Sequence, residues 1–240
     1  TELQSRQELY DMFNSRPMPD DQLMLNLGLY MRSSMVAKFL FLNEAYNMIK
    51  HLPGVIMEFG VWWGQNLILF ENLRAVYEPF NHTRRIIGFD TFEGYPQPSG
   101  VDKLSSTIKK GGYAVSENYQ QYLDSLMDFH ENNNVLKAIK KHSTVAGDVS
   151  QSLPKFLKQY PETVVALAYL DLAIYEPTKA CLKALKPHLL PGSVLIMDEF
   201  NHAEYPGATL AFKEEFKGVK YEALTSQFMT DRTFIRILEI

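Results

Sequence analysis

The sequence has 240 residues, of which 46% are hydrophobic and 22% charged, with a formal net charge of −4. This composition is typical of a globular protein with one large core, and the scattered basic residues form no stripe for nucleic acid. The longest apolar run, 164–170, is too short to cross a bilayer, and the first residues lack the pattern of a signal peptide. A single cysteine excludes an internal disulfide. We therefore expect a cytoplasmic protein without nucleic-acid or membrane partners.

Apolar residues at helical spacing in 20–50 predict helices before the first strand, so that residues 1–50 form an N-terminal helical extension. From there, short apolar strands alternate with helical patterns, which predicts a parallel sheet with helices on both faces. The expected strands are Val55–Phe59, 85–89, 140–147, 164–172 and 193–197. The expected helices are 65–78, 118–129, 176–188 and 206–217.

Two further strand patterns, YEALTSQFM and TFIRILEI, lie on either side of a turn near the end of the sequence. They predict an antiparallel edge of the sheet. Residues 95–117 are polar and glycine-rich, and a loop of this length in a compact domain is usually functional or disordered. We expect a lid there. The division is thus a helical extension followed by a catalytic domain, 51–240, with a lid or acceptor insertion at about 95–134.

In an open parallel sheet, ligands bind beyond the carboxyl ends of the strands. The turn after the first strand reads G-x-x-x-G from Gly60 to Gly64, with two tryptophans between the glycines. A dinucleotide site requires G-x-G-x-x-G, so this turn disfavours NAD and FAD and tolerates a nucleoside without phosphates. Asp90 ends the second strand and suits two ribose hydroxyls. These features indicate S-adenosylmethionine, although tight strand-to-helix packing also explains the glycines.

Three carboxylates follow the other buried strands, namely Asp171, Asp198 and Glu199. If their strands are neighbours, these groups lie close together and repel one another unless they share a cation or a proton. Oxygen ligands alone favour Mg²⁺ or Ca²⁺ over zinc. The alternative is that Glu199 is solvated and that Asp198 caps a loop.

Four segments resemble the macrocin O-methyltransferase (TylF-type) family: IMEFGVWWGQN, IIGFDTFEGYP, LAYLDLAIYEPTKACLKALKPHLLPGSVLIMDEF and AEYPGATLAF. The resemblance extends over roughly residues 30–215. It implies an α/β, Rossmann-like class I S-adenosylmethionine-dependent methyltransferase fold, with a mostly parallel seven-stranded sheet and an antiparallel C-terminal strand. It also implies a divalent cation, commonly Mg²⁺, and a small-molecule acceptor. The expected acceptor is a sugar hydroxyl in a natural product, a nucleotide sugar or a polysaccharide.

The resemblance assigns the metal ligands to Asp171, Asp198 and Glu199. It assigns cofactor contacts to Glu58, Phe59, Gly60, Val61, Trp62, Gly64, Asn66, Asp90, Thr91, Gly147, Asp148 and Val149. Two positions depart from the family pattern. The usual Asp-Gly-Asp after the fourth strand is Asp171-Leu172-Ala173 here, and the second aspartate of the later pair is Glu199. We therefore expect the metal affinity or the acceptor geometry to differ.

Two residues are candidates for the general base. Asp171 is one, and His202 is the other because its unperturbed pKa lies near neutrality. Other functions stay open, namely amino-sugar N-methylation, a metal-dependent hydrolase, a nicotinamide oxidoreductase and a non-catalytic methyltransferase-like binding module. The apolar N-terminal helices favour a homo-oligomer, or they cover their own core.

Overall fold

The computed structural model describes residues 1–103 and 108–240, so 104–107, inside the predicted lid, lie outside the described residues. Contacts divide the chain into two units, Thr1–Leu40 and Phe41–Ile240. The domain division predicted after residue 50 stays a prediction.

The first unit holds α1 (Glu2–Asn14), α2 (Asp20–Leu23), the 3₁₀ helix η1 (Met24–Tyr30) and the start of α3 (Ser33–Ile49). A capping box starts α1, because the Thr1 side chain accepts from the backbone of Gln4 and the Gln4 side chain accepts from Thr1. Within Thr1–Leu40, all of which the structure describes, no side chain of α1, α2 or η1 is buried. The helices predicted here are confirmed, and their apolar side chains are exposed or half-buried.

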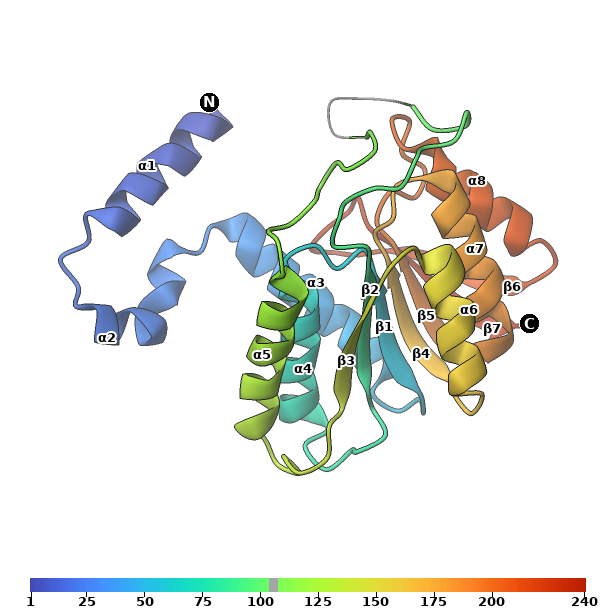
Figure 1. Cartoon of the computed structure of the whole chain (residues 1–240), viewed down its shortest axis with the longest axis horizontal. Coiled ribbons are helices and arrows are strands. Elements are labelled where there is room, and N and C mark those ends of the chain that lie inside the picture. Colours follow the sequence, from blue (N-terminus) through green and yellow to red (C-terminus); the bar gives the residue numbers. More distant parts are fainter. Residues whose placement is uncertain (104–107) are drawn as a thin grey trace. The chain divides into compact units, whose positions relative to one another are not determined.

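In the described part of the second unit, seven strands form one sheet in the order β3-β2-β1-β4-β5-β7-β6 (Figure 1). Their bounds are β1 Val55–Phe59, β2 Ile86–Asp90, β3 His142–Ala146, β4 Val165–Leu170, β5 Leu189–Met197, β6 Lys220–Thr225 and β7 Thr233–Glu239. Neighbours from β3 to β5 pair in parallel, whereas β7 pairs antiparallel with both β5 and β6. The predicted mostly parallel sheet with an antiparallel C-terminal edge is therefore confirmed.

Helices cover both faces of this sheet, as predicted. In Figure 1, α3, α4 and α5 lie on one face, and α6, α7 and α8 lie on the other. The bounds are α4 Gln65–Tyr77, α5 Tyr119–Asn132, α6 Val149–Gln159, α7 Tyr175–Leu185, the 3₁₀ helix η2 Lys186–His188, and α8 Pro206–Glu215. The sequence did not predict α6, because Pro154, normally a helix breaker, stands in its interior.

Successive residues of the central strands enter two separate cores. Along β1, Met57 and Phe59 pack with the side of the sheet that α6, α7 and α8 cover, and Ile56 packs with α3, α4 and α5. Every residue of β1 and β4 is buried. A strand buried on both faces is apolar at nearly every position, which explains the apolar runs in the sequence. The exception in β1 is Glu58, the residue before its last one.

Candidate active site at the carboxyl ends of the strands

Backbone pairing continues one residue past the ends of β1, β4 and β5. The amide of Asp171 donates to the carbonyl of Phe59 at 2.9 Å, and the amide of Asp198 donates to the carbonyl of Leu170 at 3.2 Å. Leu170 and Met197 are direct partners in the sheet. The two aspartates therefore occupy the first positions beyond adjacent strands, which meets the condition on which the sequence prediction depended.

Asp171, Asp198 and Glu199 each present a carboxylate oxygen within 4.8 Å of the others, and we call them the acid cluster. Asp198 is only 9% exposed. Among the described residues, the Oε2 atom of Glu199 is buried without a hydrogen-bond partner. Burial, followed by the charges of Asp171 and Asp198, raises the pKa of Glu199 to about 9. A group of three such carboxylates needs a proton or a cation, so its oxygen ligands fit a hard divalent ion.

Asp198 has two partners from elsewhere in the sheet. The Tyr169 hydroxyl donates to its Oδ1 atom at 2.5 Å, and Arg232 forms an ion pair with the same carboxylate. Burial, and then the charge of Asp198, raises the pKa of Tyr169, so the phenol stays protonated and donates. Asp198 is therefore fixed in place rather than solvated, and sequence reasoning assigned no role to either partner.

The two glycines of the first turn are required by close packing. Gly60 has φ +88°, and a Cβ atom there would lie 2.0 Å from the backbone oxygen of Asp171. Gly64 has φ +77°, and a Cβ atom there would lie 2.3 Å from the side chain of Leu123. L side chains rarely adopt such backbone angles. The packing explanation that the sequence left open therefore holds, whether or not the turn also binds a ligand.

The predicted ribose acid, Asp90, already organises two loops. Its Oδ2 atom accepts from the amide of Trp62 at 2.8 Å, and its Oδ1 atom accepts from the amide of Phe92 at 2.7 Å. Each carboxylate oxygen can accept a second hydrogen bond, so a ligand diol still fits. Nearby, Thr91 donates to the carbonyl of Gly94 at 2.6 Å, which closes the turn after β2.

The remaining predicted cofactor residues lie along the same edge with different exposure. Glu58 is 1% exposed and accepts from the amide side chain of Asn66 at 2.7 Å. Asp148 caps α6 by accepting from the amide of Ser150 at 2.8 Å, and it follows the left-handed Gly147. Three side chains are buried in the hydrophobic cores, which limits any ligand contact to their backbone: Phe59, Val61 and Val149.

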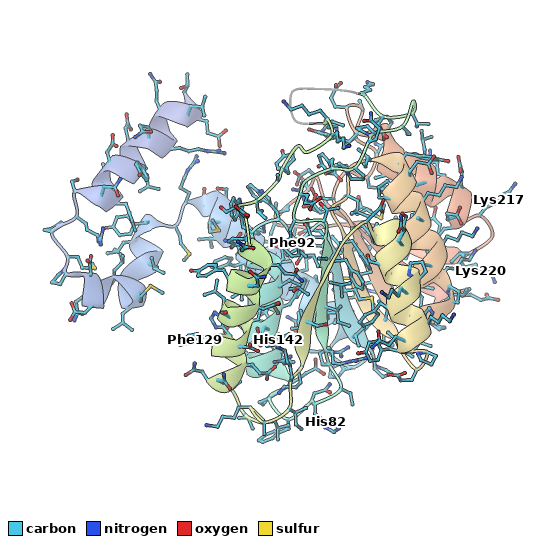
Figure 2. The ribbon with its side chains drawn as sticks, viewed as in Figure 1. His82, Phe92, Phe129, His142, Lys217 and Lys220 are labelled. Carbon is cyan, nitrogen blue, oxygen red and sulfur yellow. The ribbon has the colours of Figure 1, made fainter. Side chains whose placement is uncertain are left out.

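Left-handed backbone angles gather at this edge. Trp62, Phe92, Ala173 and Asn201 have φ between 50° and 61° and follow β1, β2, β4 and β5, respectively. Figure 2 labels Phe92 at this end of the sheet. Such angles cost about 1–3 kcal/mol each in residues other than glycine, and they concentrate at functional sites. Nothing in the sequence marks these positions, because the angle is imposed by the surrounding packing.

Aromatic residues of the predicted lid lie near the acid cluster. The ring of Tyr113 meets Trp62 edge-on at 5.7 Å and Tyr95 at 5.6 Å between centroids. Burial, followed by the charges of Asp171 and Glu199, raises the pKa of Tyr95. Sequence reasoning assigned these tyrosines no role, since a loop without periodicity does not show which side chains point inward.

His202, the alternative base, lies on the loop after β5. Its Nδ1 atom accepts from the amide of Glu204 at 3.2 Å, and its ring lies 4.9 Å from that of Tyr205. The side chain is exposed. Its catalytic role stays a prediction.

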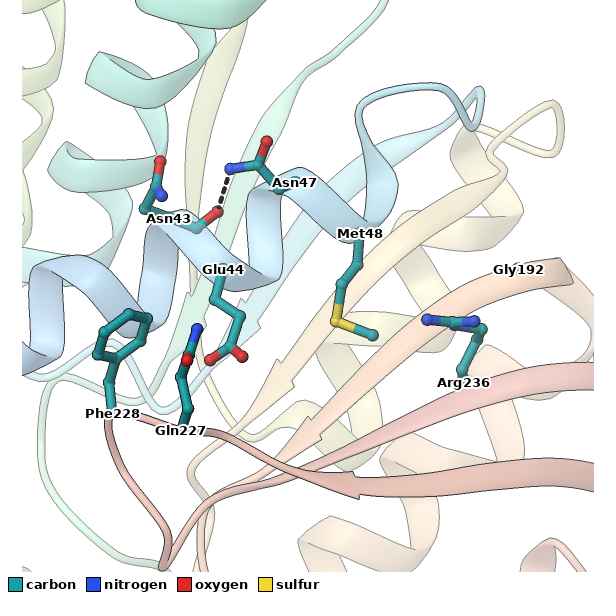
Figure 3. A pocket seen from close by; sticks show the side chains of 8 residues that line it. All are labelled: Asn43, Glu44, Asn47, Met48, Gly192, Gln227, Phe228 and Arg236. Carbon is teal, nitrogen blue, oxygen red and sulfur yellow. Dashed lines mark hydrogen bonds between the residues drawn. The ribbon is translucent and has the colours of Figure 1, made fainter.

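A separate pocket lies between α3 and the strands β5 and β7 (Figure 3). It is lined by Asn43, Glu44, Asn47, Met48, Gly192, Gln227, Phe228 and Arg236. None of these residues belongs to the predicted sites. The Ser226 hydroxyl donates to Glu44 at 2.5 Å, which ties the turn between β6 and β7 to α3.

The sheet order, the antiparallel C-terminal strand and the site at the strand ends define the class I methyltransferase fold. The structure of the O-methyltransferase NovP has this fold, with a TM-score of 0.63 and 19% identity over 85% of this chain and 81% of NovP. The profile of the macrocin-O-methyltransferase (TylF) family matches residues 34–221. The chain therefore belongs to that family, and the resemblance seen in the sequence is confirmed. Family and fold support S-adenosylmethionine as the methyl donor.

Two relatives are more similar in sequence. This chain is 31% identical, over 161 residues or 62% of its length, to the 8-demethyl-8-(2,3-dimethoxy-alpha-L-rhamnosyl)-tetracenomycin-C 4'-O-methyltransferase of Streptomyces olivaceus. That match spans 54% of the relative, about half its length. The apo structure of CalS11, a TDP-rhamnose 3'-O-methyltransferase of calicheamicin biosynthesis, is 33% identical with a TM-score of 0.83. Another CalS11 structure reaches 36% identity and a TM-score of 0.92, covering 98% of this chain and 92% of CalS11.

Among the described residues, no helix is both long enough and apolar enough to span a bilayer.

Proposed function

We propose that this chain transfers a methyl group from S-adenosylmethionine to a hydroxyl of a deoxysugar, either in a glycosylated natural product or in a nucleotide sugar. The acid cluster at the carboxyl ends of β4 and β5 is the observation that carries this proposal. The relatives support the acceptor class, since CalS11 is described as acting on TDP-rhamnose and the Streptomyces olivaceus enzyme as acting on a rhamnosyl compound.

In this proposal, the methyl donor lies along the ends of β1 and β2. Asp90 accepts hydrogen bonds from the ribose hydroxyls through the lone pairs that its two backbone partners leave open. The tight turn at Gly60 and Gly64 lets the backbone approach the donor closely. Gly147 and Asp148, which follow β3, supply further contacts to the methyl donor. Binding of both substrates in near-attack geometry supplies much of the rate, on the order of 7–11 kcal/mol in favourable cases.

The acid cluster would hold a divalent cation, with Mg²⁺ the best fit to three carboxylate oxygens. When bound, such an ion lowers the pKa of a coordinated hydroxyl and orients it. The chain's residues do the rest: Tyr169 holds Asp198 by its hydrogen bond, and Tyr95 and Tyr113 shield the acceptor from water. Proton removal from the acceptor falls to Asp171, with His202 as the second candidate.

The test is calorimetric titration of the full chain with S-adenosylhomocysteine, with and without Mg²⁺, followed by methyl transfer to TDP-rhamnose and to rhamnosylated polyketides. Micromolar binding of the donor product together with transfer to either acceptor supports the proposal. Donor binding with transfer only to an amino sugar identifies an N-methyltransferase. Donor binding without any transfer favours a binding module. Absence of donor binding contradicts the proposal and returns the acid cluster to a hydrolase function.

A further inference from the structure

Arg232 reaches the acid cluster from a distant part of the sequence. It lies in the turn between β6 and β7, and the next residue, Thr233, pairs with Met197 at the end of β5. The antiparallel return of β7 therefore brings this turn to the carboxyl edge of the parallel strands. There the Nε atom of Arg232 forms an ion pair with Oδ1 of Asp198, the oxygen that also accepts from Tyr169.

The turn that carries Arg232 is built rather than loose. The amide of Arg232 donates to the carbonyl of Met229 at 3.0 Å. Ser226, which is 1% exposed, accepts from the amide of Phe228 at 3.0 Å and donates to Glu44 of α3 at 2.5 Å. Figure 3 shows Glu44, Gln227 and Phe228 in the lining of one pocket. The Arg232 side chain is 21% exposed. Its guanidinium is held by ion pairs with Asp198 and with the neighbouring Asp231.

The loop after β4 adds no further carboxylate two positions beyond Asp171, because the residue there is Ala173, which is 2% exposed. The cluster thus combines three carboxylates with a guanidinium that is ion-paired with one of them. A divalent ion that approaches Asp198 must share that carboxylate with Arg232 and meet its positive charge.

We propose that Arg232 is a built-in counter-charge of the acid cluster, a positioning residue that holds Asp198 and lowers the affinity of the cluster for a divalent cation. The inference rests on the proposed function, because it takes the acid cluster to be a cation site. In this arrangement the ion is exchangeable. It binds weakly to the protein alone and more tightly when acceptor hydroxyls add further oxygen ligands.

A titration of the full chain with Mn²⁺, without any substrate, tests the effect of Arg232 on cation affinity directly. Binding is monitored as the loss of the paramagnetic signal of the free ion. A unit charge a few ångströms from a bound ion changes its affinity by about tenfold or more, even where screening is strong. Arg232→Met should therefore tighten Mn²⁺ binding by about tenfold or more. Arg232→Lys, which keeps the charge, should bind as the unchanged chain does.

Arg236→Met is the matched control. Arg236 lies on β7, four residues after Arg232, and is 41% exposed. It pairs with Glu222 at 3.3 Å, so its removal takes away one positive charge that is not paired with the acid cluster. It should leave Mn²⁺ affinity unchanged. Far-UV circular dichroism and the thermal midpoint report folding of each variant, and Arg232→Gln replaces the methionine variant if that one does not fold.

The outcomes separate the inference from the proposed function. Unchanged or weaker Mn²⁺ binding in the neutral Arg232 variants, while the unchanged chain binds the ion, overturns the inference alone. If neither the unchanged chain nor these variants bind Mn²⁺ but S-adenosylhomocysteine still binds, the cation site itself is wrong and the inference fails with it. Binding that appears only after the arginine is neutralised supports the inference most strongly.

Discussion

Two groups of ionisable side chains, one buried and the other half-buried, lie at opposite ends of the strands of the sheet. At the amino-terminal edge, His142 at the start of β3 lies 3.3 Å from Glu71 and 3.5 Å from Glu131. Arg74 contacts Glu131 at 3.1 Å and Glu71 at 3.5 Å, and Lys141 contacts Glu131 at 2.5 Å. Figure 2 labels His142 at this end and Phe92 at the other. We call these five residues the ion network.

Both groups place three potential metal ligands within 4.8 Å of one another. They differ in charge balance. In the ion network, two carboxylates face Arg74 and Lys141, both 2% exposed at the side chain, so the charges cancel and join α4 and α5 to β3. In the acid cluster, three carboxylates face Arg232. Proximity of acids therefore does not by itself distinguish a structural ion network from a candidate ligand site, whereas unbalanced negative charge favours the latter.

The largest expected effect tests the structural side of this comparison. Arg74→Met leaves Glu71 and Glu131 buried with too few cations, so we expect the free energy of unfolding to fall by about 3–5 kcal/mol. Urea denaturation measures it. Arg85→Met is the control, because its pair with Glu162 is long, at 3.9 Å, and partly exposed, so about 0–1 kcal/mol is expected. Equal losses of unfolding free energy in both variants would mean that the ion network adds no more stability than a partly exposed ion pair.

The next effect tests the functional side. Asp171→Asn removes one carboxylate from the acid cluster, and methyl transfer should fall by about a hundredfold or more if this group organises the reaction. Binding of S-adenosylhomocysteine and the thermal midpoint should stay close to those of the unchanged chain. Asp128→Asn, beside the ion network, is the control and should transfer normally. Turnover near the original level in Asp171→Asn would exclude the assigned role.

A smaller effect concerns stability at the acid cluster. Because the pKa of Glu199 is raised to about 9, the folded cation-free chain holds a proton there that the unfolded chain releases above about pH 4.5. Stability is therefore lost as the pH rises from about 4.5 towards 9. Glu199→Gln should raise the free energy of unfolding at pH 8 by about 1 kcal/mol, measured with a chelator present. Added Mg²⁺ should stabilise the original chain but not this variant. A lower unfolding free energy for Glu199→Gln would contradict the conclusion that the acid cluster carries a surplus of negative charge.

The smallest effect is the pH response of the ion network. Burial alone would lower the pKa of His142, but the hydrogen bond and charge of Glu71 and the charge of Asp128 outweigh it, so the pKa is raised. A pKa that is raised in the folded state stabilises the fold in full below the unfolded-state pKa, near 6.5. This stabilisation is lost as the pH rises through the folded-state pKa. The difference in unfolding free energy between the original chain and His142→Gln should therefore shrink between pH 6 and pH 9. A difference that grows with pH would contradict the sign.

Prediction from the sequence succeeded where the pattern is local. The strand at Val55–Phe59 has the predicted bounds. The helices predicted at 65–78 and 206–217 begin where α4 and α8 begin, and their predicted ends lie within two residues of the observed ends. It was less accurate for β5, which begins at Leu189 and not at 193. Pro191 and Gly192 resemble a turn but lie inside that strand, where the register with β4 is irregular and Gly192 has φ +96°. A bulge absorbs residues that local rules treat as a stop.

By itself, the sequence determined the alternation of strands and helices and the place of the acids at the strand ends. The reason is that a strand buried on both faces tolerates few carboxylates along its length, so most of them lie at or beyond its end. Only the tertiary structure decided which charges meet. Arg232 joins Asp198 because β7 returns antiparallel beside β5, and Glu71 meets His142 because α4 packs on β2, the neighbour of β3. Pairing across the sheet depends on strand order and register, which no local pattern encodes.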